Sequence, residues 1–108
     1  MRDTVEKALA DWKPELDRVN TLLGFSELLT GLAEEASELA QAALKLRRAV
    51  DGRNPTPVSA AEASEKLNEE FADVILCAAA LGIDEKGVEK YVRQKSCRWI
   101  TRLEEGCE

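Results

Sequence analysis

Two short acidic segments share one pattern and carry most of the chemistry that this sequence offers. The segment LAEEASELAQA begins at Leu32, and the segment LNEEFADVILC begins at Leu67. Each has an apolar residue, one spacer, two glutamates, two spacers, an acidic residue and a further apolar residue. Helical repeat proteins need about three or more copies to bury a continuous core. Two copies therefore indicate a paired site instead of a repeat array.

Helical geometry predicts that the acids of the two segments meet. Each residue advances about 100° around a helix axis, so apolar residues at spacings of three and four form a seam. Glu35 and Glu38 lie about 60° and 120° to one side of the first seam. Glu70 and Asp73 lie at the same angles from the second, so an antiparallel pair with facing seams brings the four carboxylates together. The predicted seams are Leu32, Ala36, Leu39, Ala43 and Leu46, and Leu67, Phe71, Val74, Ala78 and Leu81.

Carboxylates gathered at the edge of a core need a compensating positive charge. Two like charges about 4 Å apart repel by about 4 kcal/mol at an effective dielectric near 20. The chain has no histidine, and its three cysteines lack the paired spacing of a zinc site, so the available ligands are oxygens. Oxygen ligands favour a hard ion, Mg²⁺ or Mn²⁺. The alternative is a pair of solvated acidic helix surfaces, which are common.

Basic and aromatic residues suited to a nucleotide lie mainly near the end of the chain. Tyr91, Lys95, Arg98 and Arg102 share one stripe at helical spacing. We expect Lys95 and Arg98 to bind phosphates, followed by Lys45, which lies about 20° from Glu38 on its helix. The alternative is a solvated basic face. The candidates for stacking on a base are Tyr91, Trp12 and Trp99, of which Trp99 is also expected to pack in the core with Val88, Val92 and Leu103.

The elements that position these residues are all predicted to be helices. Apolar spacings of three and four and the near absence of strand patterns indicate an all-α bundle of four to five helices in a single domain, residues 1–108. The acids lie on the second and third helices, which we expect to be antiparallel, and DGRNPTPVSA connects them. Ser26 and Asp84 are the predicted N-caps. The predicted helices are about Thr4–Leu22, bent or broken near Pro14, then Ser26–Val50, Ala60–Leu81 and Asp84–Glu105.

Composition limits the partners. A net charge of −6 argues against binding to nucleic acid or to an anionic membrane surface. No stretch approaches the ~20 apolar residues of a membrane span, and the first residues do not resemble a signal peptide, so we expect a cytoplasmic protein. The run from Val74 to Leu81 is apolar on every side of its helix. Since such a helix must be buried all round, we expect a homodimer or homotetramer.

The two acidic motifs resemble those of the all-α nucleoside triphosphate pyrophosphohydrolases, the MazG-like group. That family shares an E-E-x-x-E motif followed by E-x-x-D, and the resemblance spans about Leu28 to Trp99. It implies that Mg²⁺ is held by four carboxylates, and that Glu34 or Glu38 positions or deprotonates the attacking water. The matching segments are Glu34-Glu35-Ala36-Ser37-Glu38 and Glu70-Phe71-Ala72-Asp73, and the implied ligands are Glu35, Glu38, Glu70 and Asp73.

The resemblance also implies a reaction. The family hydrolyses a nucleoside triphosphate between the α and β phosphates, and we expect a dNTP substrate and a housekeeping role in the nucleotide pool. Two alternatives stay open: an activity like that of phosphoribosyl-ATP pyrophosphohydrolase, and a non-catalytic helical module for oligomerisation or regulation whose acids bind a partner. Metal dependence separates the enzymes from the module, because only the enzymes predict metal-linked stabilisation and pyrophosphate release.

Overall fold

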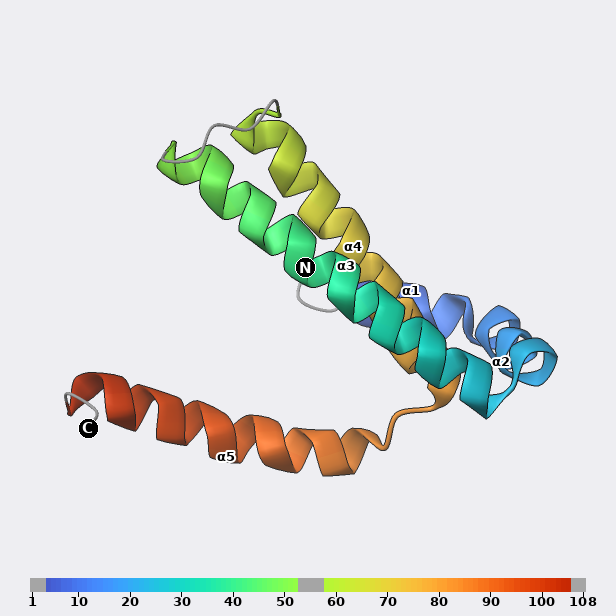
Figure 1. Ribbon diagram of the computed structural model, residues 1–108. Coiled ribbons are helices and arrows are strands. Elements are labelled where there is room, and N and C mark those ends of the chain that lie inside the picture. The colour runs from blue at the N-terminus through green and yellow to red at the C-terminus, as the bar shows by residue number, and fades with distance from the viewer. Residues whose placement is uncertain (1–3, 53–57, 106–108) are drawn as a thin grey trace.

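The computed structural model describes residues 4–52 and 58–105, and this part of the chain is almost entirely helical, with no strand. The all-α class predicted from the sequence is confirmed for these residues (Figure 1). Part of the predicted connection, residues 53–57, lies outside the described ranges. The five helices are α1 Thr4–Asp11, α2 Lys13–Leu23, α3 Phe25–Asp51, α4 Ala60–Leu81 and α5 Glu85–Glu104.

The first predicted helix is broken, as expected near Pro14. The break falls at Trp12, and Pro14 lies in the first turn of α2, where its missing N–H removes no helical hydrogen bond. Gly24 then separates α2 from α3 with a φ of +86°, a conformation that glycine adopts without steric cost. The prediction of Ser26 as N-cap is wrong, because Gly24 is the N-cap and Ser26 already lies inside the first turn of α3.

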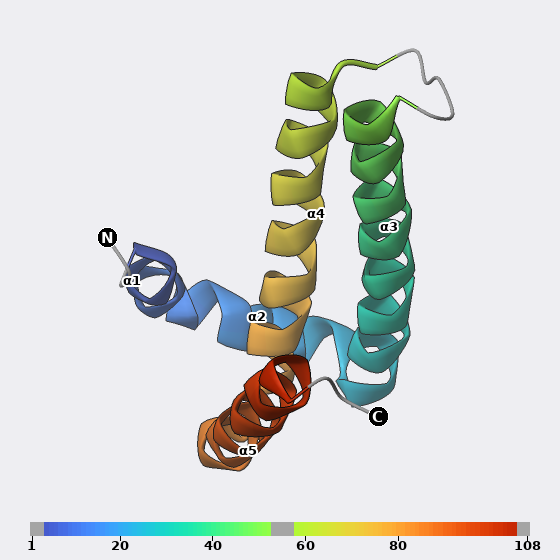
Figure 2. The same ribbon diagram turned by 90° about the vertical axis from the view of Figure 1, so that its left-hand side faces the viewer.

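The helices α3 and α4 form the central element of the structure. They lie side by side and run in opposite directions (Figure 1, Figure 2). Ser59 fixes the start of α4 through a capping box with Glu62, in which each residue's side chain bonds the other's backbone N–H. Across the other end of α4, Asn20 of α2 donates a hydrogen bond to the Ala80 carbonyl at 2.8 Å. The hairpin is therefore fixed at both ends of α4.

The helix faces that meet in this hairpin differ from the predicted seams. Residues seven apart return to nearly the same face of a helix. The contact is centred on two such rows, one on each helix, which together we call the contact stripe. Cys77 faces α3, as shown by its Sγ, which would lie 3.8 Å from a Cβ added to Gly31. Ala42 and Ala63, both buried at one end of the stripe, allow the helices to approach closely there. The contact stripe consists of Leu28, Glu35 and Ala42 of α3 and Ala63, Glu70 and Cys77 of α4.

Because the contact is rotated, several predicted seam residues are exposed. Ala36 and Ala43 are exposed, and Phe71 is 49% exposed. Together with Leu29 they each directly follow a residue of the contact stripe, and so lie about 100° from it. In an antiparallel pair, rotations of the same sign lead to the same side. We call this set, Leu29, Ala36, Ala43 and Phe71, the apolar side of the hairpin.

The opposite side of the hairpin is charged. Glu38, Lys45, Lys66 and Asp73 each lie three residues after a member of the contact stripe, about 60° from it in the other direction. We call this set the polar side. The predicted positions of Glu35 and Glu70 beside the seam are therefore wrong, since both glutamates lie within the contact itself.

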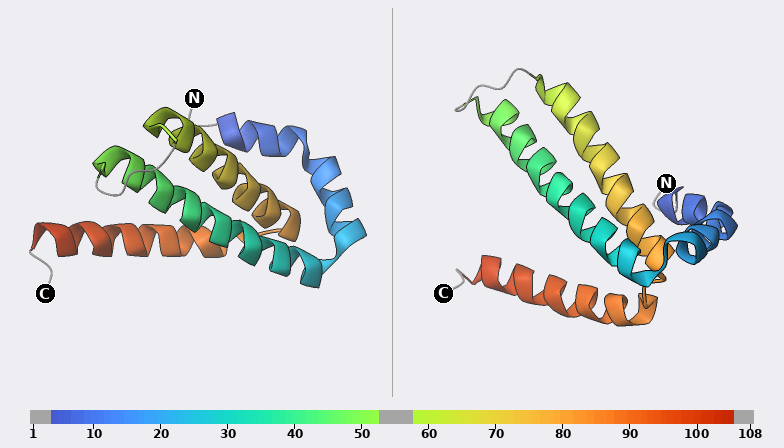
Figure 3. Two further views of the ribbon diagram at one scale, coloured as in Figure 1. Left: turned by 45° about the horizontal axis from the view of Figure 1, so that its top comes forward. Right: turned by 45° about the vertical axis from the view of Figure 1, so that its right-hand side comes forward.

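The last helix packs against no other helix to more than a marginal extent within the described residues. Asp84 is its N-cap, as predicted, and accepts a hydrogen bond from the Gly87 N–H at 3.1 Å. From there α5 extends away from the hairpin (Figure 3). The prediction that Trp99 packs in the core is wrong for a single chain, because it is 69% exposed on this unpartnered helix. One chain thus forms only part of the predicted bundle.

None of the helices in the described ranges is both long enough and apolar enough to cross a membrane.

Candidate metal centre

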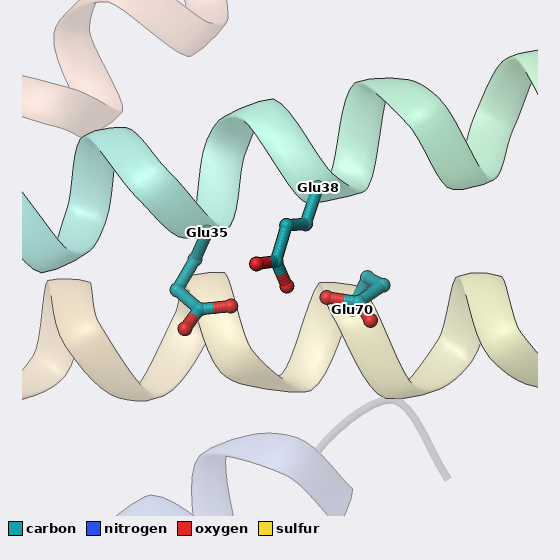
Figure 4. A group of neighbouring side chains, drawn as sticks. All are labelled: Glu35, Glu38 and Glu70. Atoms are coloured by element: carbon teal, nitrogen blue, oxygen red, sulfur yellow. The ribbon is translucent and has the colours of Figure 1, made fainter.

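Three carboxylates from the two helices of the hairpin come together. Glu35 and Glu38 project from α3 toward α4, where Glu70 lies opposite them (Figure 4). One carboxylate oxygen of each lies within 4.8 Å of the others. Glu35 and Glu38 are one turn apart on α3, and Glu70 lies in the middle of α4, away from the ends of both helices. The regular part of the hairpin therefore positions all three.

The hydrogen bonding of this cluster is incomplete. Glu70 is only 3% exposed, and its Oε2 pairs with Lys66 Nζ at 2.9 Å. Its other oxygen, Oε1, is buried and has no hydrogen-bond partner among the described residues, and the same holds for Oε1 of Glu35. Buried carboxylate oxygens are costly to leave without a partner, since they lose their hydration. The two orphaned oxygens mark a place where a ligand would be stabilising.

The electrostatics of the cluster show the same deficit of positive charge. Burial raises the pKa of Glu35 above its ordinary value of 4.5, and the nearby charges of Asp73, Glu38 and Glu70 raise it further. Asp73 is therefore close enough to act on Glu35, although it is not one of the three carboxylates that converge. Burial and repulsion by neighbouring carboxylates therefore both disfavour a negative charge on Glu35.

The donor set fits a hard divalent cation. Oxygens bound to one Mg²⁺ at about 2.1 Å lie at most about 4.2 Å apart, so small rotations of flexible glutamates would bring the three oxygens to binding distance. Burial raises the pKa of the Cys77 thiol, and the charges of Glu35 and Asp73 add to this effect. Cys77 thus stays protonated at neutral pH and offers no thiolate. The ligands within reach are carboxylates, as the sequence predicts.

A pocket of about 300 Å³ opens beside the carboxylates on the polar side of the hairpin. It contains Lys45, which the sequence analysis predicts as a phosphate ligand, and Lys66, which it misses. Hydrogen bonds to Glu70 and Glu69 raise the pKa of the Lys66 ammonium. The spacing of four residues between Lys66 and Glu70 is the signal that could have found it. The pocket is lined by Glu38, Gln41, Ala42, Lys45, Lys66 and Glu70.

The other predicted site residues lie elsewhere in the chain. Lys95, Arg98, Tyr91 and Trp99 are on α5, and a single chain does not bring them to the carboxylates. Tyr91 is exposed, with the Lys90 ammonium 5.5 Å from the centre of its ring. Trp12 is exposed between α1 and α2. Glu34 precedes Glu35 and is exposed.

Comparisons of the chain with protein-family models, with curated proteins and with solved structures find no match. The family resemblance therefore rests on the two acidic motifs.

The raised pKa of Glu35 leads to a pH-dependent stability. The folded metal-free protein holds a proton on Glu35 more strongly than the unfolded chain does, so this group's favourable contribution is lost as the pH rises from about 4.5 through the folded pKa. In EDTA at pH 7, Glu35→Gln is expected to melt at a higher temperature than the wild type, and the difference should vanish below pH 4.5.

Thermal unfolding followed by circular dichroism from pH 4 to 8 measures this difference. Glu34→Gln is the matched control, because it removes a neighbouring exposed carboxylate that lies outside the convergent set. An equal rise in both variants, or a lower melting temperature for Glu35→Gln at pH 7, would contradict the expected repulsion within the cluster.

Proposed function

We propose that this chain is a Mg²⁺-dependent nucleoside triphosphate pyrophosphohydrolase of the MazG-like kind. Its substrate class is a nucleoside triphosphate, with dNTPs preferred, and its products are a nucleoside monophosphate and pyrophosphate. The observation that carries the proposal is the meeting of Glu35, Glu38 and Glu70 with two orphaned buried oxygens, beside a pocket that contains lysines. The proposed role is housekeeping of the cytoplasmic nucleotide pool.

The proposed ligands are Glu35, Glu38, Glu70 and Asp73. Three of them converge, and Asp73 is close enough for its charge to act on Glu35. When bound, Mg²⁺ would neutralise phosphate charge and make a water more acidic. Manganese, which also prefers oxygen ligands, is expected to substitute. Glu70 is buried and Glu35 is half-buried, which holds two ligands in place, whereas Glu38 lies at the solvent edge.

The residues at the solvent edge would serve the attacking water. In the proposed step a water oxygen bonds to one phosphorus of the α–β bridge and the bond from that phosphorus to the bridging oxygen breaks. The group on the other side of the bridge leaves with the bonding electrons, which gives a nucleoside monophosphate and pyrophosphate. The water's proton needs an acceptor within reach. Glu38 is exposed beside the pocket and Glu34 is exposed nearby, so either carboxylate is available.

The phosphate chain would meet the pocket on the polar side. Lys45 lines the pocket together with Glu38, which supports its role as a phosphate ligand. Lys95 and Arg98 lie on α5, which hardly contacts the hairpin of its own chain. Their proposed contact with phosphate therefore requires a second copy of the chain to present its α5.

A homo-oligomer is supported by surface that one chain leaves uncovered. The apolar side of the hairpin exposes Leu29 and Phe71, and α5 exposes Val92, Trp99 and Leu103. Large apolar side chains exposed in such number are typical of a surface that binds another chain. Because the apolar side faces away from the pocket, a homodimer or homotetramer formed through it would leave the carboxylates accessible.

The non-catalytic module is the competing class of function. Such a module would also expose apolar surface for a partner, but it gives no reason for two buried oxygens without hydrogen-bond partners at the centre of a helix pair. The phosphoribosyl-ATP activity uses the same bond cleavage, and the choice of substrate decides between it and the proposed function.

Pyrophosphate release tests the proposed reaction. We expect release from at least one nucleotide in a panel of NTPs, dNTPs and phosphoribosyl-ATP, dependent on Mg²⁺ and abolished by EDTA. Glu38→Gln and Asp73→Asn should each lower kcat/KM by at least about 100-fold, because each removes a charge from the proposed ligand set. A coupled assay for pyrophosphate measures all of these rates.

The matched control is Glu27→Gln, which removes an exposed glutamate from the first turn of α3 and should retain wild-type activity. Release of pyrophosphate from phosphoribosyl-ATP and from no other compound would identify phosphoribosyl-ATP, and not a dNTP, as the substrate. No release from any compound by the folded, metal-loaded protein would reject the enzyme and favour the module.

The proposed assembly through the apolar side of the hairpin can be tested by adding one negative charge to that side. The wild type should sediment as a dimer or tetramer at micromolar concentration, and Phe71→Glu should shift it to monomer, because the new carboxylate would be buried without a partner. Thr30→Glu adds the same charge on the exposed back of α3 and should leave the assembly intact. A wild-type monomer in sedimentation velocity would contradict the proposed oligomer.

A further inference from the structure

Lys66 holds two carboxylates of very different burial. Its ammonium lies 2.9 Å from Oε2 of Glu70 and donates a hydrogen bond to Oε1 of Glu69 at 3.3 Å. The Lys66 side chain is 57% exposed, whereas the Glu70 side chain is 4% exposed. Glu70 is thus fixed inside the contact, and Lys66 reaches it from solvent on a flexible stem. The pair therefore consists of a fixed, buried Glu70 carboxylate and an exposed Lys66 ammonium on a flexible side chain.

From its position on α4, the Lys66 ammonium can reach a second partner besides Glu70, namely a ligand in the pocket. Lys66 and Lys45 line the same pocket from opposite helices, α4 and α3. The carboxylates Glu38 and Glu70 line it as well. A phosphate group in this pocket would therefore meet an ammonium from each side. Lysine binds phosphate as a compact, strongly hydrated charge on a long stem, which suits a contact that forms and breaks.

The local charge determines whether the Lys66 ammonium pairs with Glu70 or with a phosphate in the pocket. In the metal-free protein, Lys66 is the cation paired with Glu70, and the convergent carboxylates carry an excess of negative charge. A divalent cation among Glu35, Glu38 and Glu70 would satisfy Glu70 and repel the nearby ammonium. A phosphate entering the pocket brings new negative charge within reach of the released Lys66.

We propose that Lys66 exchanges partners during the cycle: it pairs with Glu70 while the metal is absent, and it binds a phosphate of the substrate once the metal occupies the carboxylates. This inference rests on the proposed function and adds a phosphate ligand to the same site. A simple helix-stabilising pair would instead behave like Lys13 and Asp17, which lie 3.1 Å apart at the same spacing of four residues, both exposed on α2.

Metal affinity in the absence of any nucleotide tests the first half of the exchange. Calorimetric titration with Mn²⁺ is expected to show Lys66→Met binding about threefold to tenfold more tightly than the wild type, because no ammonium then competes for Glu70. Lys66→Arg keeps the charge and should stay within about twofold of the wild type. Lys13→Met removes the comparison pair and should also leave metal affinity unchanged. Lys66→Gln serves if Lys66→Met does not fold.

Pyrophosphate affinity tests the second half. With saturating Mg²⁺, Lys66→Met is expected to bind inorganic pyrophosphate at least about tenfold more weakly than the wild type, while Lys66→Arg retains binding. Wild-type values for Lys66→Met in either titration would overturn the exchange and leave the proposed function standing. A wild-type protein that binds no Mn²⁺ would overturn both.

Discussion

A carboxylate buried between two helices requires positive charge, and the contact between α3 and α4 contains two such carboxylates. Glu35 and Glu70 occupy central positions of the contact stripe, and the equivalent places one heptad away hold Leu28, Ala42, Ala63 and Cys77. Among the described residues, the Lys66 ammonium pairs with Glu70. One oxygen of each glutamate stays without a partner among the described residues. The proposed metal resolves this deficit, and the pocket, the reaction and the role of Lys66 all depend on it.

The two sides of the hairpin have different proposed roles, one in chemistry and the other in assembly. Residues three positions after the contact stripe build the polar side, and residues one position after it build the apolar side. The chemistry and the proposed assembly can therefore use the same pair of helices without competing for surface. The exposed apolar residues of α5, such as Trp99, add to the surface that a second copy would cover.

Local signals predicted the helices, because capping residues and glycines act within one or two turns. Of the four acids that the motif spacing predicted to meet, Glu35, Glu38 and Glu70 converge and Asp73 lies outside the set. The rotation of the hairpin could not be predicted from hydrophobicity. Ala36 and Phe71 are apolar, so hydrophobicity alone assigns them to the helix contact. With these residues in the contact, Glu35 and Glu70 are predicted to lie beside it. Trp99 was expected in the core, but α5 packs at most marginally against the other described helices, and the side chain is exposed. Lys66 belongs to no basic stripe, and only its spacing of four residues from Glu70 could have indicated its role.

The most direct measurement is anomalous X-ray scattering from crystals grown with Mn²⁺. We expect a peak about 2.1 Å from carboxylate oxygens of Glu35, Glu38 and Glu70, with the previously unpartnered Oε1 atoms among the ligands or turned toward the ion. Manganese bound only to exposed acids elsewhere, with the oxygens of Glu35 and Glu70 bonded to protein donors, would contradict the central claim.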